Sequence, residues 1–243
     1  MYSLNGVLKK VPELARLLHR DGVSGLVDKI THWRQHRAAQ PKIDSEYGTD
    51  TLSWVAVKDF SASGPNIPYA SEYGPSPAYD FELILKQLPV DCRKYTFVDL
   101  GCGKGLVLML ASQFGFSRII GIEFARNLYE IAMANLDKFR RSADAQPIEV
   151  ILGDAVEFAF PTEPLVVYLY HPFGAAVILP VLTNLRGSLS EHPRDCWVVY
   201  VNPVHHQVLA GCDFLITHRA VLGKESGEPY AMYKMRRVDP SYE

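Results

Sequence analysis

An acid and three glycines stand at the end of an apolar run, in the sequence FVDLGCGKGL of residues 97–106. Phe97, Val98 and Leu100 predict a buried strand of a parallel sheet. The glycines let the chain turn sharply where the strand ends, and their missing side chains let a ligand touch the backbone. Asp99 comes just before the turn, where we expect its carboxylate to meet a cationic amine rather than a phosphate. The pattern predicts a site for a nucleotide-like ligand that carries an amine.

The glycine spacing separates two kinds of cofactor. A dinucleotide fingerprint, G-x-G-x-x-G, would need its third glycine at position 106, which is Leu106. The spacing D-x-G-x-G-x-G instead resembles motif I of class I methyltransferases that depend on S-adenosylmethionine (SAM). The resemblance implies that Asp99 lies near the methionyl end of SAM, beside the residues of the turn, which are Gly101, Cys102, Gly103 and Gly105. A tight turn without a ligand is the alternative.

Two further acids follow the next strands along the chain. Glu123 lies 20 residues after Gly103, the distance at which an acid in a βαβ unit reaches the ribose hydroxyls; a surface acid near a helix start is the alternative. The resemblance implies that Asp154 binds the adenine amino group, with the Ala155 amide nearby, although Asp154 is also suited to cap the next turn. Phe124 is expected against the adenine, or as packing.

The fourth predicted strand ends in Tyr170, His171, Pro172 and Phe173. Ligands of doubly wound sheets bind where the strand order reverses, so His171 should face the Asp99 turn. The element is similar to the Asn/Asp-Pro-Pro-Tyr/Phe motif of methyltransferases that modify amino groups, with His in place of Asn/Asp. We expect His171 to orient or deprotonate an amine or hydroxyl, between walls formed by Tyr170 and Phe173. A bond from His171 to a nearby backbone carbonyl, shaping the loop only, is the alternative.

The elements that must position these residues alternate regularly. They predict an α/β fold with a doubly wound, mostly parallel sheet and a closing antiparallel hairpin. This fits the seven-stranded, Rossmann-like sheet that the resemblance to class I methyltransferases implies. The expected strands are 97–100, 118–122, 148–152, 165–170, 196–201, 214–222 and 230–235, and the expected helices are 81–88, 126–141 and 177–189, the last bent or started at Pro180.

Before this domain, residues 43–80 read as a loop-rich lid segment, rich in Gly, Pro, Ser and Tyr. Stiff backbone and aromatic rings suit a lid over a cofactor, and a plain connector is the alternative. Methyltransferases of the non-SET lysine-modifying group, to which the chain shows a distant similarity, carry a Tyr-x-Pro-Thr element that contacts SAM. The resemblance implies contacts from Tyr73 and from Ser76, which stands where Thr is usual.

Charge is divided unevenly along the chain. Residues 1–42 carry eight Lys and Arg and three Asp and Glu, a net charge of +5. The formal net charge of the whole chain is −2, so the remaining residues carry −7. Apolar residues at helical spacing predict that this basic extension forms two amphipathic helices. Such helices are suited to bind nucleic acid, an anionic surface or an acidic partner. The alternative is that they form a cap packed on the predicted SAM-binding domain, residues 81–243.

Composition limits the class of protein. With 243 residues, of which 48% are hydrophobic and 21% charged, the chain is expected to form one soluble domain with an extension. Its four cysteines form no C-x-x-C pair, which predicts free thiols in a reducing compartment. Without a run of 18 apolar residues or a signal peptide, we expect a cytoplasmic protein with no transmembrane segment.

The leading hypothesis is a SAM-dependent methyltransferase with a nitrogen acceptor, in a protein or a small molecule. A non-catalytic SAM-fold binding protein and, less favoured, a nicotinamide-dependent oxidoreductase are the alternatives. His205, His206 and Cys212 are candidate metal ligands, but no metal is expected. The adjacent histidines would point in different directions, and no acidic residue follows at ligand spacing.

Overall fold

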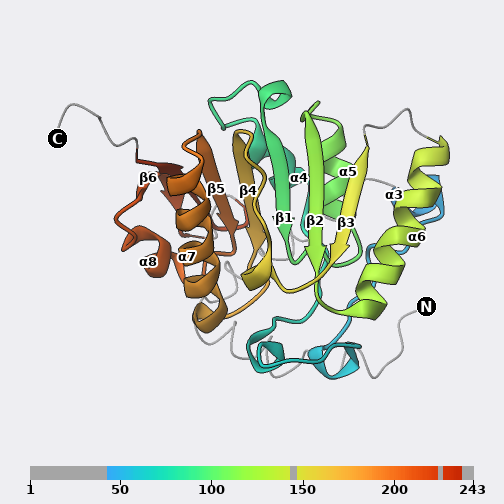
Figure 1. Ribbon diagram of the computed structural model, residues 1–243. Coiled ribbons are helices and arrows are strands. Elements are labelled where there is room, and N and C mark those ends of the chain that lie inside the picture. The colour runs from blue at the N-terminus through green and yellow to red at the C-terminus, as the bar shows by residue number, and fades with distance from the viewer. Residues whose placement is uncertain (1–42, 143–146, 224–226, 237–243) are drawn as a thin grey trace, which may run out of the picture. The chain divides into compact units, whose positions relative to one another are not determined.

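A seven-stranded sheet organises the molecule, with strand order β3-β2-β1-β4-β5-β7-β6 (Figure 1). The first five strands along the chain are parallel, and β7 is antiparallel to both of its neighbours. The order reverses between β1 and β4, as predicted for a doubly wound sheet. The strands are β1 (Thr96–Leu100), β2 (Arg118–Glu123), β3 (Ile148–Leu152), β4 (Leu165–Tyr170), β5 (Cys196–Val201), β6 (Leu215–Val221) and β7 (Tyr230–Met235).

The computed structural model describes residues 43–142, 147–223 and 227–236. All of them belong to the second of two units into which the chain divides, residues 41–243. The two helices expected in residues 1–42 lie outside the described residues.

Alternating side chains of the strands build a core on each face of the sheet. On β1, Phe97 packs with the first core and Val98 with the second, because successive side chains of a strand point to opposite faces. Helices α4 (Ala78–Leu85), α5 (Leu106–Ser112) and α6 (Arg126–Ser142) cover the first face. Helix α7 (Ala175–Glu191) and the short η4 (Ala155–Glu157) cover the second, and α8 (His206–Ala210) follows β5.

Strand bounds agree with the sequence more closely than helix bounds do. β3, β4, β5 and β7 begin and end at the predicted residues. Helix α4 begins three residues before the predicted start, directly after Pro77. Helix α7 begins at Ala175, two residues before the predicted start, and contains Pro180, so of the two alternatives a helix start at this proline is wrong.

The lid segment contains three short helical turns and crosses the carboxyl edge of the parallel strands. The turns are α3 (Ile43–Tyr47), η1 (Val57–Asp59) and η2 (Ile67–Tyr69), and Figure 1 shows η1 and η2 below the ends of the parallel strands. One isolated antiparallel bridge joins Val55 to Tyr73, and another joins Ala70 to Phe173. The segment is therefore attached by main-chain bonds to itself and to the loop after β4.

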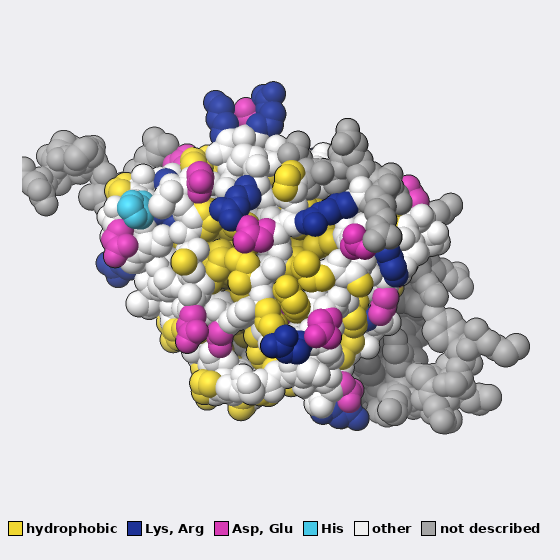
Figure 2. Space-filling view, turned by 45° about the vertical axis from the view of Figure 1, so that its right-hand side comes forward, with side chains coloured by type: hydrophobic (Ala, Val, Ile, Leu, Met, Phe, Trp, Pro, Cys, Tyr) yellow, Lys and Arg dark blue, Asp and Glu magenta, His cyan; other side chains and the backbone are white. Residues whose placement is uncertain are grey.

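Charges of both signs are mixed on the surface seen in Figure 2, where Lys and Arg lie among Asp and Glu around a central group of hydrophobic side chains. The helices within the described ranges fall short of the length and hydrophobicity that crossing a bilayer requires.

Candidate active site

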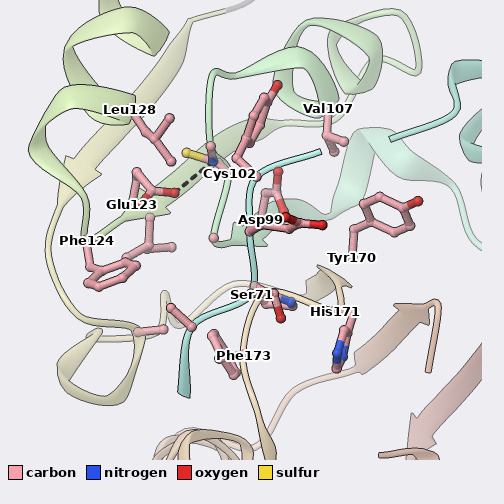
Figure 3. A pocket seen from close by; sticks show the side chains of 18 of the residues that line it. Ser71, Asp99, Cys102, Val107, Glu123, Phe124, Leu128, Tyr170, His171 and Phe173 are labelled. Carbon is pink, nitrogen blue, oxygen red and sulfur yellow. Dashed lines mark hydrogen bonds between the residues drawn. The ribbon is translucent and has the colours of Figure 1, made fainter. Parts of the chain in front are cut away.

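A cleft opens at the carboxyl ends of β1, β2, β3 and β4, beneath the lid segment (Figure 3). Its empty space is about 880 Å³ including the part open to solvent, within the size range of cofactor sites. The predicted site residues that line it are Tyr73, Ser76, Asp99, Gly101, Cys102, Gly103, Glu123, Phe124, Asp154, Ala155, Tyr170, His171 and Phe173.

Gly105 is the predicted site residue that does not line the cleft. It precedes α5 as its N-cap with φ of +85°. A Cβ at this position would lie 3.5 Å from the Cβ of Ala132 on α6. Gly105 therefore lets the turn pack against a helix rather than against a ligand.

Asp99 is a buried carboxylate that faces the cleft from the middle of the sheet. It pairs in register with Gly121 of β2 and Tyr168 of β4, and only 3% of it is exposed. Within the described part of the chain, no group donates a hydrogen bond to it. Burial, and then the nearby Glu123, raise its pKa well above the ordinary value. A cationic ligand group in the cleft would stabilise its ionised form.

Glu123 is held in a fixed orientation by the main chain. Its Oε2 accepts a hydrogen bond from the Gly103 amide at 2.9 Å, and its Oε1 accepts one from the Ala125 amide at 2.8 Å. Burial raises its pKa to about 7, although these backbone hydrogen bonds and one from Phe124 act in the opposite direction. Each oxygen keeps a lone pair with which to accept from a ligand hydroxyl.

Gly103 is required by a close contact with the lid segment. Its φ is +54°, and a Cβ there would lie 2.2 Å from the ring of Tyr73. Tyr73 is itself fixed, because its hydroxyl donates to the carbonyl of Thr51 at 2.7 Å. The loop of residues 101–105, which we call the cofactor loop after its predicted role, and the ring of Tyr73 are therefore packed directly together.

Asp154 is already bonded on both oxygens. Its Oδ1 accepts from the Val156 amide at 3.0 Å, so the predicted capping role is confirmed. Its Oδ2 accepts from the side-chain amide of Asn66, in the lid segment, at 2.7 Å. Phe124 lies nearby, edge-on to Phe60 with ring centroids 6.0 Å apart. An aromatic and polar wall thus surrounds the end of the cleft at β3.

Two smaller side chains complete the part of the cleft around β1. The buried Ser76 lines the cleft together with Tyr168. Cys102 is buried, and burial followed by the charges of Asp99 and Glu123 raises its pKa well above the ordinary value. Cys102 therefore stays a neutral thiol, which is not a nucleophile near neutral pH.

His171 marks the other end of the cleft, between β4 and β5. Its φ is +41°, an uncommon conformation for a non-glycine residue. Its Nδ1 lies 3.0 Å from the hydroxyl of Tyr200, so the ring bonds a side chain rather than the backbone carbonyl of the alternative hypothesis. The ring of His205 is 5.5 Å away between centroids. Burial, and then His205, lower the pKa of His171, so the imidazole is neutral near pH 7.

The walls of this end come from both sides of the loop. Phe173 is buried and Tyr170 is partly buried, and both line the cleft. The Ser71 amide donates to the carbonyl of Pro172 at 2.9 Å. The lid segment therefore forms one wall of the space in front of His171.

Sequence reasoning missed Phe60, Asn66, Tyr200 and His205 as residues of the site. Phe60 and Asn66 lie in a part of the lid segment without a motif, and Tyr200 lies inside a uniformly apolar strand. Across the described ranges, no group of three His, Cys, Asp or Glu side chains is placed to hold a metal ion. His205 instead lies beside His171, and the thiol of Cys212 lies 3.3 Å from the carbonyl of Val208.

Comparisons with known proteins bear on the fold. No protein-family model matches the sequence, and no curated protein matches it. A proposed RNA methyltransferase from Pyrococcus horikoshii has a similar structure, with 16% identity, a TM-score of 0.51 and coverage of 76% of this chain and 96% of that chain. An RNA methyltransferase from Salinibacter ruber, solved with S-adenosyl-L-homocysteine, has 23% identity, a TM-score of 0.47 and coverage of 68% and 96%. A SAM-dependent methyltransferase from Aquifex aeolicus has 16% identity, a TM-score of 0.49 and coverage of 64% and 89%. The strand order and the likeness to the Pyrococcus structure show that the chain has the seven-stranded, Rossmann-like fold of the class I SAM-dependent methyltransferases.

Proposed function

We propose that this protein is a SAM-dependent methyltransferase that acts on a nitrogen acceptor in a protein or a small molecule. The observation that carries the proposal is the buried Asp99 carboxylate, which faces the cleft and accepts no hydrogen bond from the described residues. A buried carboxylate is stabilised in its charged form by an opposite charge. The amino group of a methionyl ligand carries that charge, whereas a pyrophosphate does not.

The residues present fit the remaining parts of SAM. Glu123 is oriented to accept from two ribose hydroxyls, because the main chain fixes both of its oxygens. Asp154, Asn66 and Phe124 offer polar and aromatic contacts for adenine. When bound, SAM supplies an electrophilic methyl group on a sulfonium that is already a good leaving group. The protein therefore has to orient the acceptor, exclude water and take up a proton.

His171 suits the last of these roles. Its lowered pKa leaves it neutral near pH 7, so it keeps a lone pair that can accept a proton from the acceptor. Tyr170 and Phe173 provide an aromatic wall beside it. The Tyr200 hydroxyl holds one ring nitrogen, which favours presentation of the other to the acceptor.

Charge around the cleft favours a neutral or cationic acceptor. Within the described ranges, the Asp, Glu, Lys and Arg side chains that line the cleft are all carboxylates, namely Glu72, Asp99, Glu123 and Asp154. The lid segment carries six Asp and Glu and a single Lys. Nucleic acids are bound mainly through cations that contact phosphates.

RNA is nevertheless the second candidate acceptor. The names of the Pyrococcus and Salinibacter proteins include RNA, and the basic residues 1–42 offer a positive segment. The acidic lining of the cleft supports the amine acceptor over RNA.

Calorimetric titration with SAM tests the proposal at the cofactor step. Asp99→Asn preserves the shape of the side chain and removes its charge, so we expect SAM affinity to fall at least tenfold, about 1.4 kcal/mol. A protein that binds NADH but not SAM, judged by thermal shift, would be an oxidoreductase instead. Absence of SAM and S-adenosylhomocysteine binding at millimolar concentration would refute the proposal.

Transfer of a labelled methyl group from SAM tests the reaction. Denatured and native protein extracts, small amines and total RNA serve as separate acceptor pools, and we expect label in a protein or amine pool. Label found only in RNA would show that the acceptor is RNA and not an amine of a protein or small molecule. SAM binding without transfer to any pool would favour the non-catalytic alternative.

A further inference from the structure

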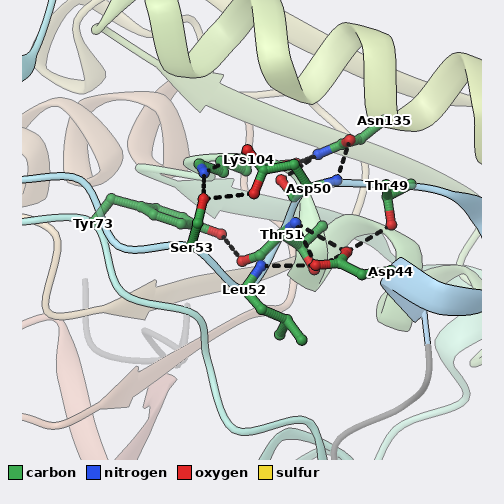
Figure 4. A network of polar contacts seen from close by, with 9 residues as sticks. All are labelled: Asp44, Thr49, Asp50, Thr51, Leu52, Ser53, Tyr73, Lys104 and Asn135. Carbon is green, nitrogen blue, oxygen red and sulfur yellow. Dashed lines mark hydrogen bonds and ion pairs between the residues drawn. The ribbon is translucent and has the colours of Figure 1, made fainter. Parts of the chain in front are cut away.

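Lys104, in the cofactor loop, is a buried cation. Its side chain is 2% exposed, and its ammonium lies 2.9 Å from Oδ2 of Asp50, in the lid segment (Figure 4). Asp50 is different, because 52% of its side chain is exposed. A charge far inside the protein is thus neutralised by a partner that remains in contact with water.

A small cluster surrounds the ammonium. Lys104 also donates to the hydroxyl of Ser53, and this hydroxyl donates to Oδ1 of Asp50 at 2.6 Å. The ring of Tyr73 lies 5.5 Å from the ammonium, close enough for a cation–π interaction. Partial burial alone would raise the pKa of Asp50, but the hydrogen bonds from Ser53 and Lys104 outweigh it and lower the pKa.

Backbone bonds connect the same two segments. The buried Asn135 of α6 donates from its amide nitrogen to the carbonyls of both Asp50, at 2.9 Å, and Lys104, at 3.0 Å. Its oxygen accepts from the Asp50 amide at 2.9 Å. Asp44 fixes the turn that precedes this point, because it accepts from Thr51 and from neighbours of Thr51 in the lid segment. The lid segment and the cofactor loop are therefore joined by side chains and by main chain.

The place of Lys104 in the loop connects this cluster to the cleft. Its neighbour Gly103 donates the amide that holds Glu123, and Gly103 is covered by the ring of Tyr73. Lys104 itself is not among the residues that line the cleft. Any effect of the ammonium on a ligand must therefore pass through the shape of the loop and the position of Tyr73.

We propose that Lys104 and Asp50 are positioning residues for the cofactor, which lock the cofactor loop to the lid segment so that Gly103, Glu123 and Tyr73 hold their binding geometry. The inference rests on the proposed function, since the ligand it concerns is SAM. It also assigns part of the lid segment, near Asp50, to the cofactor site itself.

Because Lys104 is buried and Asp50 is half-exposed, substitution of each residue should change the SAM affinity by a different amount. Asp50→Asn leaves the ammonium buried without its carboxylate, which is costly, whereas Lys104→Met removes the buried charge and leaves Asp50 free to be hydrated. In full-length protein we expect the dissociation constant for SAM to rise at least twentyfold in Asp50→Asn and about threefold in Lys104→Met. The double variant should resemble Lys104→Met, so the second substitution rescues the first.

Three readouts separate positioning from other roles. Calorimetry gives the SAM affinity, steady-state kinetics should place the change in KM for SAM rather than in kcat, and circular dichroism should remain native. Glu149→Gln is the matched control, because the pair between Arg118 and Glu149 is half-exposed on both sides at 2.6 Å. We expect no change in SAM affinity in this variant.

Two outcomes would overturn the inference. If Lys104→Met weakened SAM binding as much as Asp50→Asn, the lysine would act on the ligand directly. If the double variant were no better than Asp50→Asn, the pair would not be coupled. Failure of the proposed function is distinguishable, because wild type would then bind no SAM, while the unfolding temperatures of the ligand-free variants would still show whether Lys104→Met rescues Asp50→Asn.

Discussion

The two ends of the cleft are built by different means. At the end where we propose that the cofactor binds, which we call the cofactor end, two backbone amides hold Glu123 and the loop around Gly103 packs against Tyr73. At the end where we propose that the acceptor binds, which we call the acceptor end, the side chain of His171 contacts that of Tyr200, and both His171 and Asn202 have positive φ. Main-chain geometry keeps a ligand site constant, whereas side-chain contacts between strand ends can change with few substitutions. The cofactor end should therefore tolerate changes at the acceptor end.

Removal of the imidazole should give the largest difference between an effect on turnover and an effect on SAM affinity. We expect His171→Ala to lower turnover about 10²- to 10⁴-fold through loss of a proton acceptor, while the SAM dissociation constant stays within about threefold. Single-turnover kinetics and calorimetry measure the two quantities. A loss of SAM affinity equal to the loss of turnover would mean that the two ends are not independent.

His171→Asn is the matched variant at this position. Asparagine accepts a positive φ more readily than most residues and is the residue of the similar amino-methyltransferase motif. Turnover in His171→Asn close to that of wild type would make the side chain an orienting group rather than a base.

A substitution in the cofactor loop should have the converse effect. Gly103→Ala places a Cβ 2.2 Å from the Tyr73 ring at a φ of +54°, so we expect SAM affinity to fall about a hundredfold and stability by roughly 2–4 kcal/mol. Gly187→Ala is the control, because among the described residues no atom beyond the adjoining backbone of helix α7 lies within 4 Å of a Cβ at that point. This control should be neutral or stabilising in chemical denaturation. Equal effects of the two substitutions would contradict the close packing of the loop.

The buried acids of the cofactor end predict a pH dependence of stability. The pKa of Glu123 is about 7 in the folded protein against an ordinary value near 4.3, so the folded state holds the proton that the unfolded state releases. The contribution of Glu123 to the stability of the ligand-free protein is therefore fully present below about pH 4.3 and is lost as the pH rises through 7, by about 3 kcal/mol at pH 7. Asp99 acts in the same direction. Thermal unfolding from pH 5 to 8 measures the slope, which Glu123→Gln should flatten; an unchanged slope would exclude Glu123 as its source.

The smallest expected effect concerns the adenine wall. Phe124→Leu removes the ring that faces Phe60 while it keeps an apolar side chain, so we expect SAM affinity to fall about threefold, or 0.6 kcal/mol. Turnover at saturating SAM should not change. An effect as large as that of Asp99→Asn would place Phe124 at the centre of recognition rather than at its edge.

Much of the fold and of the cofactor end could be predicted because the signals are local. A strand that ends in an acid and a glycine turn specifies the place of Asp99, and an acid one βα unit later specifies that of Glu123. Runs of buried apolar residues give the bounds of inner strands such as β4 and β5.

The remaining contacts join residues that are far apart in sequence. Asp50 and Lys104 are separated by 54 positions, and Asn66 and Asp154 by 88. No period or spacing links such pairs, because packing of the lid segment against the sheet brings them together. Asn135 is buried on helix α6, but its hydrogen bonds depend on partners that the pattern of that helix does not contain.

The path of residues 69–73 has a consequence for how quickly the cleft can exchange its contents. The amide of Ser71 is bonded to the carbonyl of Pro172, and the amide of Tyr73 to the carbonyl of Val55, each at 2.9 Å. If the nucleoside that we propose as ligand lies beneath this stretch and leaves through it, its residence time should follow the free energy of opening these bonds. Slow deuterium uptake at these two amides, with an opening rate that matches the turnover number when product is bound, would identify product release as the slow step of the proposed reaction.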